Sequence, residues 1–101
     1  MIIASKTYHR LDTTTPWHFK VVETGKVEFV AQLNTNQSNL IMNSSTLSDD
    51  ELSITFVTIW ENEEAYEQYK VDPILNVYWG ARDEYNASVG ITAGATSVET
   101  V

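Results

Sequence analysis

The chain has 101 residues, a formal net charge of −8 and no cysteine. A chain of this length forms one domain, here residues 1–101. The acidic balance weighs against binding to nucleic acid or an anionic membrane, and the lack of cysteine excludes disulfides and cysteine zinc sites. The start lacks the segments of a signal peptide, and no run reaches the roughly 18 apolar residues of a membrane helix, so we expect a cytoplasmic protein.

The first half of the chain shows strand patterns on either side of an ambiguous stretch. Ile2–Arg10 reads as a strand with Ile2, Ala4, Lys6 and Tyr8 on one face. The stretch from Trp17 to Asn36 fits a helical stripe but also short strands. We favour a helix over residues 26–34, after Gly25, because a crossover is needed before the next strand, Leu40–Leu47.

The second half has clearer signals. Leu52–Trp60 is uncharged and rich in β-branched and aromatic residues, which predicts a strand paired with Leu40–Leu47 in a hairpin. Asn62 is placed to cap a helix that ends at Asp72-Pro73, and this pair can cap a second helix. Its apolar stripe is expected at Ile74, Val77, Tyr78, Ala81 and Tyr85, before a last strand over Val89–Val98.

The resulting order, β-α-β-β-α-β, predicts an α+β, ferredoxin-like fold with helices on one face of a four-stranded antiparallel sheet. Three of the four strand segments carry no charge on either face, although one face has no helix to cover it. A second copy of the same sheet is the simplest cover, so we expect a homodimer through the open sheet face.

The segment from Trp60 to Pro73 resembles the second-helix region of the dimeric α+β-barrel superfamily, which includes the antibiotic-biosynthesis-monooxygenase-like domains. The shared features are an aromatic strand end, a Glu-Ala pair, a helix and an acidic residue before proline. The chain is most similar to the small members known from marine environmental sequences, which have no assigned activity. The resemblance implies a dimeric α+β barrel.

The resemblance also implies where catalytic residues would lie. Enzymatic and haem-handling members often carry a histidine late in this helix and another just past the proline, where this chain has Tyr69 and Ile74. This departure argues against the family's catalytic set. If the protein is an enzyme, the candidates for its base or hydrogen-bond donors are His9, Tyr69 and Trp60. His18 is the second histidine of the chain and has no partner at ligand spacing.

Two functions from different classes follow. The first hypothesis is a binding or structural module without catalytic activity or cofactor, because the strands are uncharged and the catalytic set implied by the resemblance is missing. No metal is expected, because the helix carboxylates such as Glu63 and Glu67 lack a histidine partner. The alternative is a cofactor-independent monooxygenase or isomerase-like enzyme acting on a small aromatic or polyketide-like compound. A polar-tipped pocket with His9 or Tyr69 would favour the enzyme, whereas a pocket filled by side chains would favour the module.

Overall fold

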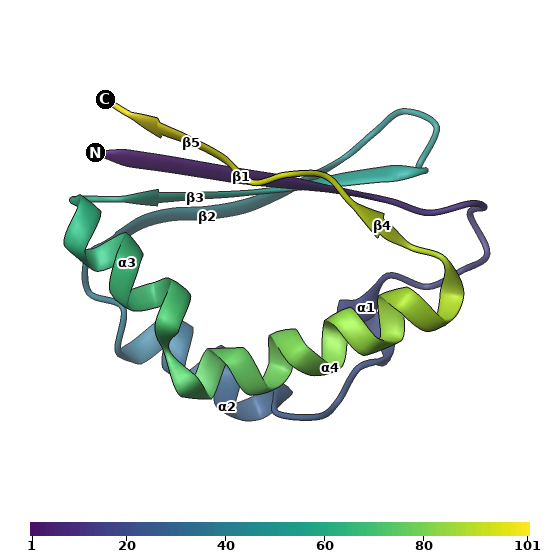
Figure 1. The fold of residues 1–101 in the computed structure, drawn as a ribbon, viewed down its shortest axis with the longest axis horizontal. Helices are drawn as coiled ribbons and strands as arrows, with labels where there is room; N and C mark the ends of the chain where they lie inside the picture. Colours follow the sequence, from purple (N-terminus) through teal and green to yellow (C-terminus); the bar gives the residue numbers. More distant parts are fainter.

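One antiparallel sheet carries all the helices on a single face (Figure 1). The structure is a computed structural model that describes residues 1–101. None of its helices combines the length and the apolar character that crossing a bilayer requires. The elements in chain order are β1 (Ile2–His9), α1 (His18–Val21), α2 (Lys26–Thr35), β2 (Leu40–Leu47), β3 (Ser53–Trp60), α3 (Glu63–Val71), α4 (Pro73–Val89), β4 (Thr92–Ala93) and β5 (Ser97–Thr100).

The sheet confirms the predicted ferredoxin-like order. Its strands run β2-β3-β1-β4, and β5 also pairs with β1. β1 and β3 form the centre, in a register that places Ile2 opposite Trp60 and His9 opposite Ser53. The sheet is open at both edges, so a single chain does not close into a barrel. Gly25 separates α1 from α2 as expected, with a φ of 69° that favours glycine.

The last predicted strand was placed too early. Residues up to Val89 continue α4, and Gly90 ends this helix in a left-handed conformation with φ 77°. The strand then forms in two pieces, β4 and β5. Between them the amide of Gly94 donates a hydrogen bond of 2.9 Å to the carbonyl of Thr7. The fourth strand of the expected sheet is thus present, but it is short and interrupted.

The predicted apolar stripe of the second helix was also partly wrong. In α4 the buried residues are Leu75, Tyr78 and Asn86, whereas Ile74 and Val77 remain 43% and 56% exposed. The reason is that Ile74 and Val77 lie on the side of α4 next to Gly25 and Glu28, where α2 covers them only in part. Val77 contacts the backbone at Gly25 so closely that a Cβ atom there would lie only 2.9 Å from a methyl group of Val77.

The predicted caps are confirmed. The side chain of Asn62 accepts a hydrogen bond of 2.9 Å from the amide of Ala65 at the start of α3. Asp72 accepts hydrogen bonds from the amides of Ile74 and Leu75 at the start of α4, and its second oxygen accepts one of 2.7 Å from Gln32 of α2. Asp72 therefore joins three helices at one point.

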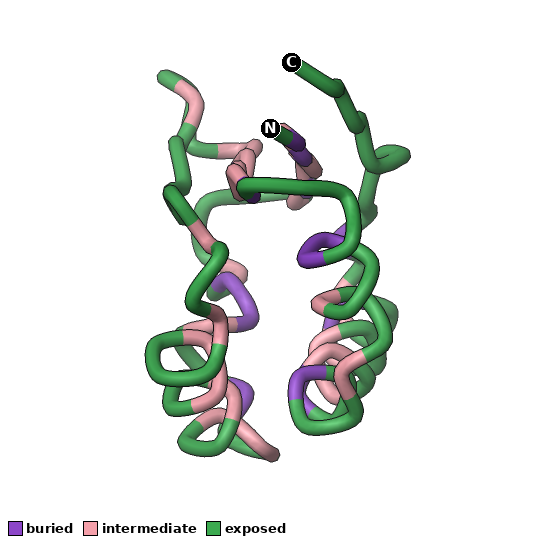
Figure 2. The backbone as a smooth tube through the Cα atoms, turned by 90° about the vertical axis from the view of Figure 1, so that its left-hand side faces the viewer, coloured by how far each residue is buried: buried purple, intermediate pink, exposed green.

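The apolar core lies between the sheet and the helices, and it is divided in two. One cluster contains Ile2, Ala4, Trp60, Ala65 and Tyr66, and the other contains Tyr8, Trp17, Ile54 and Ile91. Both clusters use the helix side of β1 and β3, but at opposite ends of these strands. No helix lies over the other face of the sheet (Figure 2).

The helix junction yields a stability prediction. Replacing Asp72 by alanine removes the cap of α4 and the link to Gln32, so we expect the free energy of unfolding to fall by about 1–2 kcal/mol. Asp72→Asn keeps an acceptor for the cap amides and should lose much less. Urea unfolding at pH 7 measures both variants. Equal losses for the two would contradict the assigned role of the cap oxygen.

Candidate functional site

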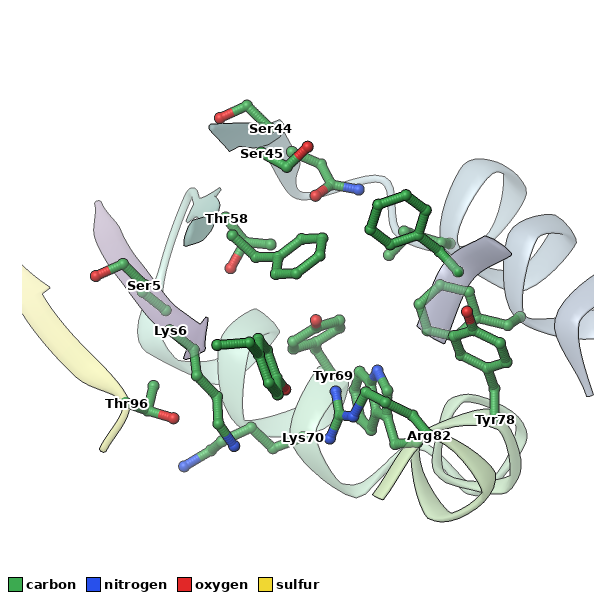
Figure 3. Close-up of a pocket in the computed structure, with 18 of the residues that line it drawn as sticks. Ser5, Lys6, Ser44, Ser45, Thr58, Tyr69, Lys70, Tyr78, Arg82 and Thr96 are labelled. Atoms are coloured by element: carbon green, nitrogen blue, oxygen red, sulfur yellow. The ribbon is translucent and has the colours of Figure 1, made fainter. Parts of the chain in front are cut away.

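A cavity of about 600 Å³ lies between the sheet and the helices (Figure 3). Its volume is typical of pockets that enclose a small organic molecule. Rings supply most of its apolar wall, and they come from β1, β3 and all four helices: Tyr8, Phe19, Phe29, Phe56, Tyr66, Tyr69, Tyr78 and Trp79. Hydroxyl and amide groups add a polar wall: Ser5, Asn43, Ser44, Ser45, Thr58 and Thr96.

The cavity occupies the gap between the two core clusters. Along β1 the inward positions Ile2 and Ala4 belong to one cluster and Tyr8 to the other, with Lys6 between them. On β3 the position opposite Lys6 is Phe56, which also lines the cavity. A charged residue therefore stands where the alternation of the strand would put an apolar one.

His18 is the histidine that the fold brings to the cavity. Its residue is 6% exposed, and its ring lies among four aromatic rings at centroid distances of 5.5–6.0 Å. Nδ1 is buried without a hydrogen-bond partner. Burial first, and then the positive charge of Arg82, lowers the pKa of His18 from 6.5 to about 4. The imidazole is therefore neutral at pH 7 and able to accept a proton.

Tyr69 projects from α3 into the same cavity (Figure 3). Its ring packs on Trp60 at a centroid distance of 4.5 Å and on Trp79 at 5.0 Å. Burial raises the pKa of Tyr69 to about 12, although Arg82 acts against this shift. The phenol thus stays protonated at neutral pH and can donate a hydrogen bond.

Arg82 supplies positive charge to the cavity from α4. Its Nε atom is bound to the carboxylate of Asp83 at 2.9 Å, and its side chain is only 16% exposed. The guanidinium carbon lies 5.6 Å from the centroid of the Tyr8 ring and 5.8 Å from that of Trp79. Burial raises the pKa of Tyr8 and of Tyr78, while Arg82 opposes both shifts. One cation therefore acts on several groups of the cavity.

The three candidates from the sequence lie in different places. Tyr69 lines the cavity. Trp60 is fully buried behind it, and its indole nitrogen donates a hydrogen bond of 3.0 Å to the hydroxyl of Thr58. His9 is exposed at the end of β1, on the face away from the helices, and its Nδ1 lies 2.7 Å from the hydroxyl of Ser53. The fold therefore brings Trp60 and Tyr69 together and leaves His9 apart.

Sequence reasoning did not single out Lys6 or Arg82. The available signal for Lys6 was a lysine sharing one strand face with Ile2, Ala4 and Tyr8. For Arg82 the signal was its helical spacing from Leu75 and Tyr78, which are both buried. No three acidic or histidine side chains of the chain are placed to hold a metal ion together.

The sequence matches no protein-family model and no curated protein. Among solved structures, the chain is similar to SnoaB from Streptomyces nogalater, a cofactor-independent oxygenase, with a TM-score of 0.69 at 12% identity, over 99% of this chain and 91% of that one. A candidate antibiotic biosynthesis monooxygenase from Deinococcus radiodurans gives a TM-score of 0.66 at 13% identity, over 100% and 92% of the two chains.

A conserved protein of unknown function from Bacteroides thetaiotaomicron extends this similarity, with a TM-score of 0.57 at 17% identity, over 97% of this chain and 93% of that one. Identities this low establish the fold alone. The expected similarity to marine environmental members stays a prediction. The chain thus has a ferredoxin-like fold similar to that of antibiotic biosynthesis monooxygenase proteins.

Proposed function

We propose that this protein binds a planar, hydroxylated aromatic compound in the cavity and oxygenates it without a cofactor. The observation that carries the proposal is an aromatic cavity of about 600 Å³ that the side chains leave unfilled. A filled interior would instead have favoured the module without activity. The description of SnoaB as a cofactor-independent oxygenase, on the same fold, supports the same reading.

The rings of the cavity suit a flat ligand. Phe29 and Tyr78 lie 4.6 Å apart at 37°, and Phe56 presents its edge to Phe19 and to Tyr8. Offset and edge-to-face contacts of this kind are also open to the ring of a flat ligand that packs against this wall. The hydroxyls of Ser45 and Thr58 can bind the polar substituents of such a ligand.

Three residues can divide the chemistry between them. The neutral imidazole of His18 takes a proton from an acidic C–H group of the substrate. The guanidinium of Arg82 stabilises the enolate that this leaves, and Tyr69 donates a hydrogen bond to its oxygen. The developing negative charge also favours the protonated form of His18 beside it, which offsets part of its low basicity.

Dioxygen is the oxidant and no other redox partner is required. The enolate transfers an electron to O₂, and the two radicals combine to form a peroxide at the deprotonated carbon. Loss of water then converts the original CH₂ group to C=O. One oxygen atom stays in the product, and the other leaves as water with the two hydrogens. A substrate that already forms a stabilised anion makes this route accessible without a metal or flavin.

The open face of the sheet supports the proposed homodimer. Its central residues include Ile3, Val57 and Ile59, with no charged side chain on this face of β2 or β3. The side-chain hydroxyls of Thr7 on β1 and Thr55 on β3 form a hydrogen bond with an oxygen–oxygen distance of 2.8 Å. Glu99 lies at the edge, on β5. A second sheet packed on this face would remove the uncovered apolar side chains from water.

The state of His18 can be tested by NMR. We expect its ring signals to report a neutral imidazole at pH 7 and to titrate near pH 4, with His9→Gln used to assign them. The pKa of His18 in the folded protein lies below its unfolded value of about 6.5. The contribution of the neutral, buried His18 to the free energy of unfolding should therefore be fully present above about pH 6.5 and decline as the pH falls toward about 4. His18→Gln should reduce this decline. A His18 titration near 6.5 would contradict its burial.

The oxygenase activity can be tested with dithranol, a hydroxylated tricyclic ketone with an acidic CH₂ group. We expect protein-dependent uptake of one O₂ per ketone oxidised, unchanged by EDTA. Loss of the base should lower kcat by about 10²–10⁴-fold in His18→Gln. His9→Gln is the matched control and should retain wild-type activity. Loss of activity in His9→Gln but not in His18→Gln would indicate that catalysis takes place on the open face of the sheet. A wild-type protein without oxygenase activity on dithranol would contradict the proposal.

The homodimer can be tested by native mass spectrometry and sedimentation. Val57→Lys places a charge at the centre of the open face, and we expect it to convert the dimer to a monomer. Val27→Lys is the same substitution at a site that is 77% exposed on α2, and it should leave the dimer intact. A wild-type monomer at micromolar concentration would exclude this assembly.

A further inference from the structure

The cavity and the rest of the molecule have opposite charge. Three of the six basic residues line the cavity, namely Lys6, Lys70 and Arg82, and none of the 14 acidic residues does so. The chain as a whole has a net charge of −8, so the charged residues that line the cavity have the opposite sign to the net charge of the chain. Cations raise the local potential, and apolar walls focus it because they exclude water.

Two of these cations already have partners. The amine of Lys70 lies 3.1 Å from the carboxylate of Glu67, and Nε of Arg82 lies 2.9 Å from that of Asp83. Lys6 forms no ion pair, and its one polar contact is with the face of the Tyr8 ring at 5.5 Å. It is partly buried on a central strand, between the two core clusters. A negatively charged ligand would supply the partner that this amine lacks.

Lys6 and Arg82 approach the same ring. The amine of Lys6 and the guanidinium carbon of Arg82 both lie within 5.6 Å of the centroid of Tyr8. In Figure 3 the two side chains, with Lys70, lie on the side of the cavity opposite Ser44 and Ser45. The cavity is therefore polar and neutral at one side and cationic at the other, which would orient a ligand with one anionic end.

We propose that the ligand is an aromatic carboxylate and that Lys6 binds its carboxylate group. This inference rests on the proposed function and specifies its substrate. In this arrangement Lys6 binds the carboxylate of the ligand, and Arg82 remains available to stabilise the enolate that forms during the reaction. An ammonium group forms a charge-assisted hydrogen bond with a carboxylate, which is stronger than a neutral one.

The experiment compares two probes of the same shape, anthracene-2-carboxylate and anthracene-2-carboxamide, by titration calorimetry with the full chain at pH 7. We expect the carboxylate to bind about 10- to 100-fold more tightly than the amide, and added salt to weaken only the carboxylate. Lys6→Met should reduce the carboxylate affinity to that of the amide and leave amide binding unchanged. Lys20→Met, an exposed lysine outside the cavity, is the matched control.

The outcomes separate the two proposals. Equal affinities of wild type for both probes, or a carboxylate affinity that Lys6→Met leaves intact, would overturn the role of Lys6 while ligand binding in the cavity stands. Absence of binding by either probe would overturn both proposals. If Lys6→Met does not fold, Lys6→Gln and the salt dependence of wild-type binding decide the same question, since only a charge-dependent contact responds to both.

Discussion

The division of the apolar core into two clusters is the constraint on which the rest of the structure depends. Trp60 and its neighbours join the sheet to α3 at one end, and Tyr8 and Ile54 join it to the chain around Trp17 and Ile91 at the other. Helices held at both ends can span the middle of the sheet without filling it. The space in between is the cavity, and aromatic rings form most of its apolar wall.

Burial, rather than any single contact, determines the chemistry available in this cavity. Removal from water lowers the pKa of His18 and raises that of Tyr69, so both groups are neutral at physiological pH. Arg82 adds a fixed positive charge that disfavours protonation of His18 and favours any anion nearby. The site thus contains a free proton acceptor, a hydrogen-bond donor and a positive charge. This combination suits a reaction that passes through an anion.

One face of the sheet lines the cavity, and no helix covers the other face (Figure 2). Side chains of β1 alternate, so Lys6 and Tyr8 enter the cavity while Ser5 and Thr7 belong mainly to the other side. A dimer formed through the open face would stiffen the central strands from behind without occupying the cavity. His9, on that face, would then lie near the partner rather than near the ligand.

The sequence by itself determined the order of the elements, the caps at Asn62 and Asp72, and the ferredoxin-like fold, because these depend on local alternation and on short-range hydrogen bonds. It also showed Tyr69 as a candidate, through its place in a recognisable helix. Only the tertiary structure decided that His18, rather than His9, faces the cavity, and that Lys6 and Arg82 meet at the Tyr8 ring. These residues come from β1, α1 and α4, and the pKa of His18 and the contacts of all of them depend on how these elements pack.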